Sequence, residues 1–360
     1  MAGSEVDDNP GSRSEKGPRM SGRGTIITGF LERIGWGDAT RHMLAGDASN
    51  RRYERLDLRG QPAVLMDAPT DKNESVGPFV ELARHLCGIG LSAPRIFAED
   101  RKNGLLLIED LGDDLFSSVL RRDPLAEQPL YLAATDALIA LHSANHPEHA
   151  PNYGPAKMVE TAGLASDWYA YGATGRRSTA GKAAIANALS NAFACLAPWS
   201  PVLVLRDYHA ENLIWLPDRE PSHAKVGLLD FQDAGLGHPA YDLMSLAHDV
   251  RREVAPETRA AMIRRYAEAR NLDRVDFEQA CATVSAQRNL RILGVFARLS
   301  MHFGKPRYVD LIPTVWSNLL GDVSHENLAD LDRTVRMHLP EPTEAILNEL
   351  RAKCATVPTL

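Results

Sequence analysis

The sequence predicts an α+β protein with a small β-rich lobe at its N-terminal end and a larger, mainly helical lobe after it. Three observations support this fold class. Short apolar or alternating runs separated by turn residues lie between residues 40 and 110, as strands do. Apolar residues recur at helical spacing between residues 240 and 340, with Pro and Gly as punctuation. One pair of short apolar strands lies between these regions, and such segregation is typical of α+β proteins.

The composition narrows the classes of function. Of 360 residues, 44% are hydrophobic and 24% charged, which allows a large packed core. The net charge is -7 without a long basic run, so nucleic acid is not expected as a partner. No apolar run reaches the length of a membrane span, and the N-terminus lacks an apolar signal core, so we expect a cytoplasmic protein. The 4 cysteines form no CxxC pair, which favours a reducing compartment over a zinc site or a disulfide framework.

Four segments are expected along the chain. Residues 1–24 are polar and rich in Gly and Ser, so we expect a disordered tail there. Residues 25–112 contain the early strands and form the N-lobe. Residues 113–340 form the C-lobe, and residues 341–360 are expected to be a C-terminal tail.

The N-lobe is expected to begin with a short amphipathic helix over residues 25–35. Residues 43–56 then read as strand, small-residue turn and strand, and residues 62–66 as a third strand. Such a turn can lay backbone N–H groups over phosphates, although plain hairpin turns have the same composition. The candidate phosphate-binding residues of this turn are Gly46, Ser49, Asn50 and Arg51.

The remaining elements follow from the same patterns. Residues 80–86 read as a helix, and residues 93–99 and 104–108 as two strands around a turn. Residues 130–142 are a strongly amphipathic helix, whereas residues 151–182 mix aromatic residues with Gly, Ser and Thr and are expected to be irregular. The late helices are expected at residues 241–251, 256–269, 277–303, 308–320 and 324–337.

Between the early strands and the late helices, three polar residues have a spacing that is typical of a catalytic centre. A buried strand over residues 202–205 is followed by Asp207 and, five positions later, by Asn212. A second strand over residues 225–229 ends on Asp230 and Phe231, and we expect the two strands to form a hairpin-like pair. The spacing D-x-x-x-x-N followed by D-F is that of a kinase-type phosphotransfer centre.

Each residue type suits a role in such a centre. Asp207 would orient a hydroxyl nucleophile and accept its proton, while Asn212 and Asp230 would ligate Mg²⁺ through oxygen atoms. Arg206 is placed either to stabilise phosphoryl charge or to fix the loop. Asp and Asn also cap turns, but three such residues at kinase spacing favour chemistry. Asp242, at a helix start, is interpreted as a structural cap or loop anchor.

The N-lobe departs from the kinase pattern at one strand end. A kinase has a lysine at the end of its third strand, and this chain has Met66 and Asp67 instead. Another cation must therefore neutralise the nucleotide phosphates. The candidates are Lys72, Arg51 and Arg52.

Two further segments bear on nucleotide binding. The strand over residues 104–108 runs into a short linker, and we expect backbone atoms of Glu109 and Leu111 to contact adenine. The run GRRSTAGK at residues 175–182 invites interpretation as a P-loop. Its glycine spacing is wrong, and Ala183 replaces the required Ser or Thr, so we exclude that interpretation.

Together these motifs resemble the aminoglycoside phosphotransferase/choline kinase superfamily, over about residues 25–340. Within it the chain is most similar to the bacterial anomeric sugar kinases of cell-wall recycling, which phosphorylate N-acetylmuramate and N-acetylglucosamine. The segments that carry the resemblance are GDASNRRYERL at 46–56, LLIEDLGD at 106–113, LRDYHAEN at 205–212, LDF at 229–231 and GHPAYD at 237–242.

The resemblance implies a protein-kinase-like, two-lobed fold with a nucleotide-binding N-lobe and a catalytic C-lobe. It implies ATP and Mg²⁺ as cofactors, and phosphorylation of the anomeric hydroxyl of an amino sugar to the 1-phosphate in peptidoglycan recycling. This subfamily shares the strand end without lysine, but Leu205 stands where a histidine usually props the catalytic loop. The residues placed to line the sugar pocket are Tyr208, His209, Glu211 and Gln232.

Other functions stay open at this point. The acceptor could be an aminoglycoside, a choline-like amine or another small hydroxyl compound, although no aromatic cage for choline is evident. A catalytically weak ATP-binding scaffold would retain nucleotide binding without turnover. A metal-dependent hydrolase would use Asp207, His209, Asp230 and Asp233 and would need a tight, His-rich cluster.

Overall fold

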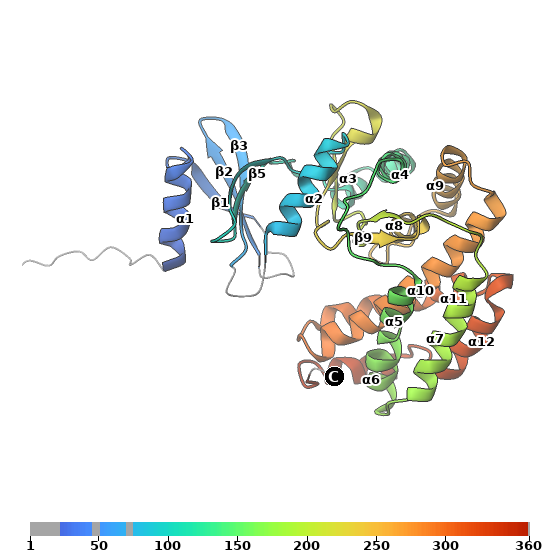
Figure 1. Cartoon of the computed structure of the whole chain (residues 1–360). Helices are drawn as coiled ribbons and strands as arrows, with labels where there is room; N and C mark the ends of the chain where they lie inside the picture. The colour runs from blue at the N-terminus through green and yellow to red at the C-terminus, as the bar shows by residue number, and fades with distance from the viewer. Residues whose placement is uncertain (1–21, 45–50, 70–74, 359–360) are drawn as a thin grey trace, which may run out of the picture. The chain divides into compact units, whose positions relative to one another are not determined.

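The computed structural model describes residues 22–44, 51–69 and 75–358 of the chain. The expected N-terminal tail therefore lies almost entirely outside the described residues, as do Gly46, Ser49, Asn50 and Lys72. The chain divides into two compact units (Figure 1). The first comprises Met1–Val76 and Ile96–Asp110, and the second comprises Gly77–Arg95 and Leu111–Leu360.

The first unit is built on a five-stranded antiparallel sheet with the strand order β1-β2-β3-β5-β4. Leu58 pairs with Gln61, which leaves Arg59 and Gly60 as a two-residue turn with φ angles of 55° and 84°. Positive φ at both turn positions is the geometry that joins two twisted strands most tightly. The strands are β1 (Thr40–Met43), β2 (Arg52–Leu58), β3 (Gln61–Asp67), β4 (Ile96–Asp100) and β5 (Leu105–Ile108).

Helix α1 (Gly22–Arg33) lies against one face of this sheet (Figure 1). Its residues Ile27, Phe30 and Leu31 pack with Leu56 of β2 and Leu65 of β3 in one buried cluster. Because side chains alternate along a strand, the opposite face carries a different apolar set. That set includes Val64, Met66, Leu106 and Ile108.

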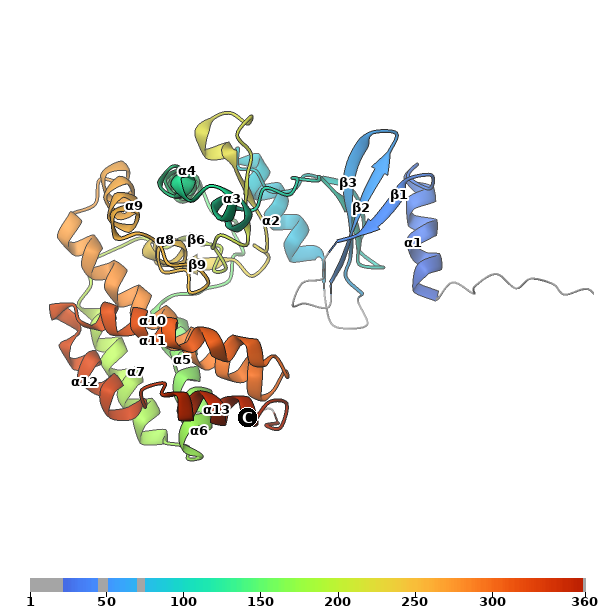
Figure 2. The same ribbon diagram turned by 180° about the vertical axis from the view of Figure 1, so that it is seen from behind.

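The second unit is mainly helical, and α10, with 28 residues, is its longest helix. It lies beside α5, α8 and α11 (Figure 2). No helix in the described ranges is both long and apolar enough to span a membrane. The helices are α2 (Gly77–Gly88), α3 (Phe116–Arg122), α4 (Glu127–Ser143), α5 (Pro155–Ala162), α6 (Tyr171–Thr174), α7 (Thr179–Ala194), α8 (Ala240–Ala247), α9 (Pro256–Ala269), α10 (Arg274–Met301), α11 (Ile312–Val323), α12 (Ala329–His338) and α13 (Glu344–Ala352).

Helix α10 owes its position partly to one glycine. At Gly294 the helix passes so close to the backbone of Leu164 that a Cβ atom would overlap the Leu164 carbonyl group. Leu164 directly precedes a π-helical stretch, η3 (Ala165–Ala170), which packs along α10. Only a residue without a side chain allows two backbones to approach in this way.

The expectation of irregular structure at residues 151–182 is wrong. This region contains α5, η3, α6 and the start of α7, where Ser178 caps the helix by accepting a hydrogen bond from Gly181 N at 3.0 Å. Gly175, with a φ of 70°, ends α6 rather than starting a loop. The stretch expected to be a C-terminal tail likewise contains α13, with Leu347 and Leu350 buried.

The central strands form two separate pairs. β6 (Val202–Val204) pairs with β9 (Gly235–Gly237), and β7 (Leu213–Trp215) pairs with β8 (Val226–Leu228). The expected hairpin between the strand before Asp207 and the strand before Asp230 is therefore wrong. Each of those strands finds a different partner, because the chain between them folds into its own strand.

Candidate active site

The loop after β6 is anchored by a buried carboxylate from helix α8. Asp242 Oδ2 accepts a hydrogen bond from Leu205 N at 2.5 Å, and Oδ1 accepts one from Arg206 N at 2.9 Å. Asp242 is fully buried, and this burial raises its pKa to about 6 even though the two backbone donors lower it. The interpretation of Asp242 as a loop anchor is confirmed by these contacts.

Arg206 has a backbone conformation that few residues adopt. Its φ is 75°, a left-handed value that persists only where the surroundings enforce it. Its side chain Nη1 donates to the carbonyl of Asp233 at 3.0 Å, and the guanidinium lies 4.6 Å from the ring centre of Tyr153. Of the two roles expected for Arg206, these contacts support fixing the loop. Leu205, in turn, is 3% exposed, so an apolar side chain packs directly before Arg206.

Asn212 connects the loop to the second strand end. Its Nδ2 donates to the carbonyl of Asp207 at 2.9 Å, and its own carbonyl accepts from Leu229 N at 3.0 Å. Leu229 directly precedes Asp230, so this bond brings Asn212 and Asp230 to neighbouring positions. Among the described residues, Asn212 Oδ1 accepts no hydrogen bond, which leaves it available to a cation.

Asp230 is also held in a left-handed conformation, with a φ of 55°. Its Oδ1 accepts a hydrogen bond from Gln232 Nε2 at 2.7 Å. Gln232 was expected to line the sugar pocket, but this contact makes it a partner of Asp230. Such a partner orients a carboxylate towards a metal ion.

The oxygen atoms of Asn212 and Asp230 fit a magnesium ion. Mg²⁺ is usually held by one or two protein oxygens together with waters and phosphates. In the described part of the chain, no three or more His, Cys, Asp or Glu side chains come together as a metal-binding group. The hydrolase alternative needs such a cluster around Asp207 and His209.

Asp207 lines a cavity of about 210 Å³ in the second unit. His209 lines the same cavity, and helix α10 contributes Arg288 and Arg291 to its wall, with Tyr308 beyond them. Burial, together with Arg251 and Arg288, holds the pKa of His209 well below its ordinary value, so the ring is neutral near pH 7.

Two of the residues expected in the sugar pocket lie elsewhere. Tyr208 is 2% exposed, and its hydroxyl donates to the carbonyl of Ala134 at 2.9 Å, so it is a core residue. Glu211 is exposed and forms an ion pair with Arg251 at 2.9 Å. The expectation that Tyr208 lines the pocket is therefore wrong, because its side chain points into the core beside α4.

The sequence reasoning assigned no role to Arg288, Arg291 or Tyr308. A signal was available, because Arg288 and Arg291 lie one turn apart on a helix that is otherwise largely apolar. Charged residues at buried helix positions are more informative than apolar ones. The distance of more than 80 positions from Asp207 hides this proximity in the sequence.

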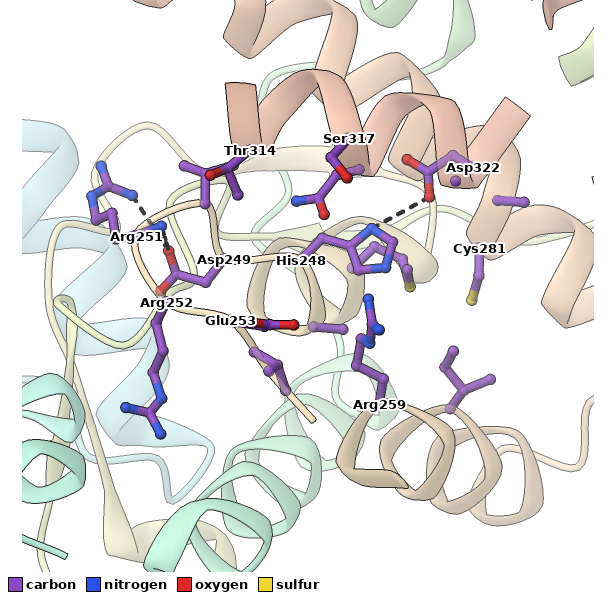
Figure 3. Close-up of a pocket in the computed structure, with 18 of the residues that line it drawn as sticks. His248, Asp249, Arg251, Arg252, Glu253, Arg259, Cys281, Thr314, Ser317 and Asp322 are labelled. Carbon is purple, nitrogen blue, oxygen red and sulfur yellow. Dashed lines mark hydrogen bonds and ion pairs between the residues drawn. The ribbon is translucent and has the colours of Figure 1, made fainter. Parts of the chain in front are cut away.

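A second, larger cavity of about 1050 Å³, shown in Figure 3, shares lining residues with the first. The segment from His248 to Arg251 lines both cavities and forms the wall between them. His248 Nδ1 lies 2.8 Å from Ser285 Oγ and 3.3 Å from Asp322 Oδ1. Asp249 Oδ2 accepts from Ala210 N at 3.3 Å, so this wall also supports the loop that carries Asp207.

The arginines of the first unit that could neutralise nucleotide phosphates lie on different faces of the sheet. Arg52 lies opposite Asp67 in the sheet, and directly opposed residues share a face. Asp67 accepts a hydrogen bond from Arg23 Nε of α1 at 2.9 Å, so both lie on the face against which α1 packs. Arg55 lies on the other face and pairs with Asp110 at 2.6 Å.

The expected nucleotide-binding residues that the structure describes lie at element ends. Arg51 directly precedes β2 and is partly buried. Glu109 directly follows β5, and Leu111 is 8% exposed. The excluded P-loop is a helix start instead, and Lys182 there forms an ion pair with Asp167 at 2.6 Å.

Comparison with known proteins places the chain among phosphotransferases. The model of the "Phosphotransferase enzyme family" matches residues 42–277. An N-acetylmuramate/N-acetylglucosamine kinase of Caulobacter vibrioides is 39% identical over 353 residues, covering 87% of this chain and 96% of the relative. A kinase of the same name from Pseudomonas aeruginosa is 34% identical over 324 residues, covering 86% and 93%.

The fold agrees with solved structures as well. The crystal structure of the ADP-bound aminoglycoside phosphotransferase APH(2'')-Ib superposes with a TM-score of 0.59 at 15% identity, covering 86% of this chain and 98% of that chain. At this identity the likeness concerns the fold alone, and it confirms the expected kinase-like class. Motifs, fold and family match agree, and the chain belongs to the phosphotransferase enzyme family.

Proposed function

We propose that this protein is an ATP-dependent kinase that phosphorylates the anomeric hydroxyl of N-acetylmuramate, N-acetylglucosamine or both, in peptidoglycan recycling. The names of the relatives that are 39% and 34% identical support the amino-sugar substrate. The observation that carries the proposal is the position of Asp207 on the wall of a small polar cavity. A carboxylate in this position can meet a hydroxyl group that enters the cavity.

Asp207 is the proposed catalytic residue. It would hold the anomeric hydroxyl in line for transfer and accept its proton as the new bond forms. An anomeric hydroxyl is more acidic than an ordinary alcohol, so a carboxylate is a sufficient base. The hydrogen bonds that Leu205 N and Arg206 N donate to Asp242 would keep Asp207 in place during this step.

The proposed cofactors are ATP and Mg²⁺. Asn212 and Asp230 would hold Mg²⁺, which neutralises phosphate charge during transfer. Arg206 would keep the loop in its left-handed turn. The proposed nucleotide contacts are the backbone of Glu109 and Leu111 for adenine and Gly46, Ser49, Asn50 and Arg51 for the phosphates.

The proposal is tested by incubating the protein with ATP, Mg²⁺ and a panel of acceptors. The panel holds both amino sugars, glucose, an aminoglycoside and choline, and ³¹P NMR assigns the phosphorylated position. We expect a 1-phosphate from at least one of the amino sugars and no turnover of choline. Phosphorylation of the aminoglycoside alone, or of a sugar at a hydroxyl other than the anomeric one, would show the proposal to be wrong. An absence of product from every acceptor would favour the ATP-binding scaffold.

A further inference from the structure

Two arginines of helix α10 face the cavity that Asp207 lines. Arg288 and Arg291 are three positions apart, so they lie on neighbouring positions of one helix face. Asn212 and Asp230, the proposed magnesium ligands, do not line this cavity. In the proposed enzyme, the arginines would therefore lie on the acceptor side of Asp207.

Arg288 has donors that nothing in the described chain satisfies. The residue is 5% exposed, and its Nη2 donates to Ser245 Oγ at 2.7 Å. Its Nε and Nη1 are buried and have no hydrogen-bond partner. The ring centre of Tyr241 lies 5.4 Å from the guanidinium carbon, which offers a cation–π contact but no acceptor for those N–H groups. Leaving a buried charged donor unpaired is costly, so an acceptor that reached Nε or Nη1 would be bound favourably.

Arg291 makes no ion pair or side-chain hydrogen bond with any described residue. Burial lowers its pKa, but the nearby Tyr241 and Asp207, with other groups, raise it by more. The guanidinium therefore stays charged at every physiological pH. Two cationic side chains on one wall of a small cavity together favour an anion.

The rest of the cavity indicates what kind of anion fits. Ile292, Val295, Phe296 and Leu299 make part of the wall apolar. A volume of about 210 Å³ suits part of a monosaccharide rather than a larger ligand. N-acetylmuramate differs from N-acetylglucosamine by a lactyl ether, which carries a methyl group beside a carboxylate. This group matches a site with both apolar and cationic walls.

We propose that Arg288 and Arg291 form a carboxylate-binding subsite that recognises the lactyl group of N-acetylmuramate. This rests on the proposed amino-sugar kinase function and assigns the residues that separate its two substrates. Arginine binds a carboxylate through two parallel hydrogen bonds, which gives direction as well as charge. N-acetylglucosamine lacks the carboxylate and would occupy the cavity without that contact.

The test compares both sugars with wild type and two variants. Arg291→Gln removes the charge of the more exposed arginine, whose loss endangers folding less than that of Arg288. Arg298→Gln is the matched control, because Arg298 lies on the same helix, outside the cavity, with its guanidinium over Phe303. We expect Arg291→Gln to raise KM for N-acetylmuramate about 10- to 100-fold. We expect KM for N-acetylglucosamine and both kcat values to change less than about twofold, and the control to resemble wild type.

The methyl ester of N-acetylmuramate removes the negative charge of the ligand, as Arg291→Gln removes a positive charge of the protein. In wild type it should bind like N-acetylglucosamine, and in Arg291→Gln, where Arg288 alone remains, esterification should cost less affinity than it does in wild type. An equal loss with both sugars, or a loss confined to kcat, would overturn the subsite and indicate a phosphate contact or a structural role. No change in either KM would overturn it as well.

The subsite and the proposed function fail in different ways. A wild-type protein that phosphorylates both sugars but shows no selective effect in Arg291→Gln disproves the subsite alone. If no sugar is phosphorylated, the subsite can still be tested by measuring the binding of both sugars without ATP. Isothermal titration should show tighter binding of N-acetylmuramate than of N-acetylglucosamine in wild type, with the difference reduced in Arg291→Gln. Equal binding of both sugars by wild type would overturn the subsite in that case.

Discussion

The backbone N–H of Arg206 donates to Oδ1 of Asp242 at 2.9 Å, across 36 positions in the sequence. Arg206 has a φ of 75°, so this hydrogen bond holds a backbone conformation that the chain would not adopt by itself. Asp207 follows directly. The position of Asp207, the proposed catalytic residue, is therefore supported by a helix that lies after it in the chain.

Replacing Asp242 tests this relationship. Asp242→Asn keeps the shape of the side chain but replaces one oxygen acceptor with an amide donor. One of the two backbone N–H groups then has no acceptor. We expect a loss of about 1–3 kcal/mol in the free energy of unfolding, and a fall in kcat of about 10- to 100-fold as Asp207 moves. Urea denaturation and steady-state kinetics measure the two effects. Asp233→Asn is the control, because Arg206 uses the backbone carbonyl and not the side chain of Asp233. A variant at 242 with normal kcat would contradict the anchoring role.

Asp207→Asn tests the proposed base. The amide cannot accept the proton, so we expect kcat to fall by about 10²- to 10⁴-fold. The fold and nucleotide affinity should be retained, because Asn212 contacts the backbone carbonyl of Asp207 and not its side chain. Kinetics and ATP titration separate chemistry from binding. Full turnover by this variant would exclude Asp207 as the base.

A substitution of Gln232 tests whether this side chain orients a metal ligand or binds the sugar. Its Nε2 donates to Asp230 Oδ1 at 2.7 Å, and Gln232→Leu removes that donor. We expect the Mg²⁺ concentration at half-maximal activity to rise by about 10- to 100-fold, with KM for the sugar unchanged. A magnesium titration at saturating sugar measures this effect. Glu211→Gln serves as a surface control, and a rise in the sugar KM of Gln232→Leu would support the pocket role instead.

Because several histidines are buried, we expect the free energy of unfolding to fall at acidic pH. Burial lowers the pKa of His142 to about 3 and that of His238 to about 4, from 6.5. The folded state therefore binds fewer protons than the unfolded state between these values, and stability falls as pH falls from 6.5 towards 4. Asp242 acts oppositely, because burial raises its pKa to about 6 and protonation favours the folded state below that pH.

Two histidines outweigh one carboxylate in that range. Each of these groups changes the free energy of unfolding by about 1.4 kcal/mol per pH unit, and His209, whose pKa burial also lowers, adds to the loss, so we expect a net loss of at least about 1.4 kcal/mol per unit between pH 6 and pH 4. Urea denaturation across this range measures the slope. His142→Gln should flatten it, since Tyr266 can still donate its hydroxyl proton to the new side chain. A stability that is constant or rises on acidification would contradict the burial argument.

The parts of the fold that follow from local patterns could be predicted. The hairpin of β2 and β3 needs only Arg59 and Gly60 as a turn between alternating strands. The roles proposed for Asp207, Asn212 and Asp230 rest on their spacing and stay predictions, and the structure shows that the side chain of Asn212 contacts the backbone of Asp207. Helices with regular apolar spacing, such as α9, agree with their predicted bounds.

Features that depend on distant partners could not be predicted. β6 pairs with β9 rather than with β8, a choice made by packing in three dimensions and not by either strand alone. Tyr208 neighbours Asp207 in sequence, yet its hydroxyl reaches the carbonyl of Ala134 in α4. In a loop no fixed alternation tells which side chain turns inward, so position beside a catalytic residue does not imply contact with substrate.

The contact at Gly294 has a consequence for how such enzymes could diverge. The close approach of backbone to backbone fixes both the rotation and the translation of α10 against Leu164. Arg288 and Arg291 lie within two turns of this point, so their place in the cavity does not depend on one another or on a bound sugar. In the proposed enzyme, substitutions at these two positions would change the preferred acceptor while Asp207, Asn212 and Asp230 stay in place. The proposed substrate preference and the proposed phosphoryl transfer would then depend on different residues.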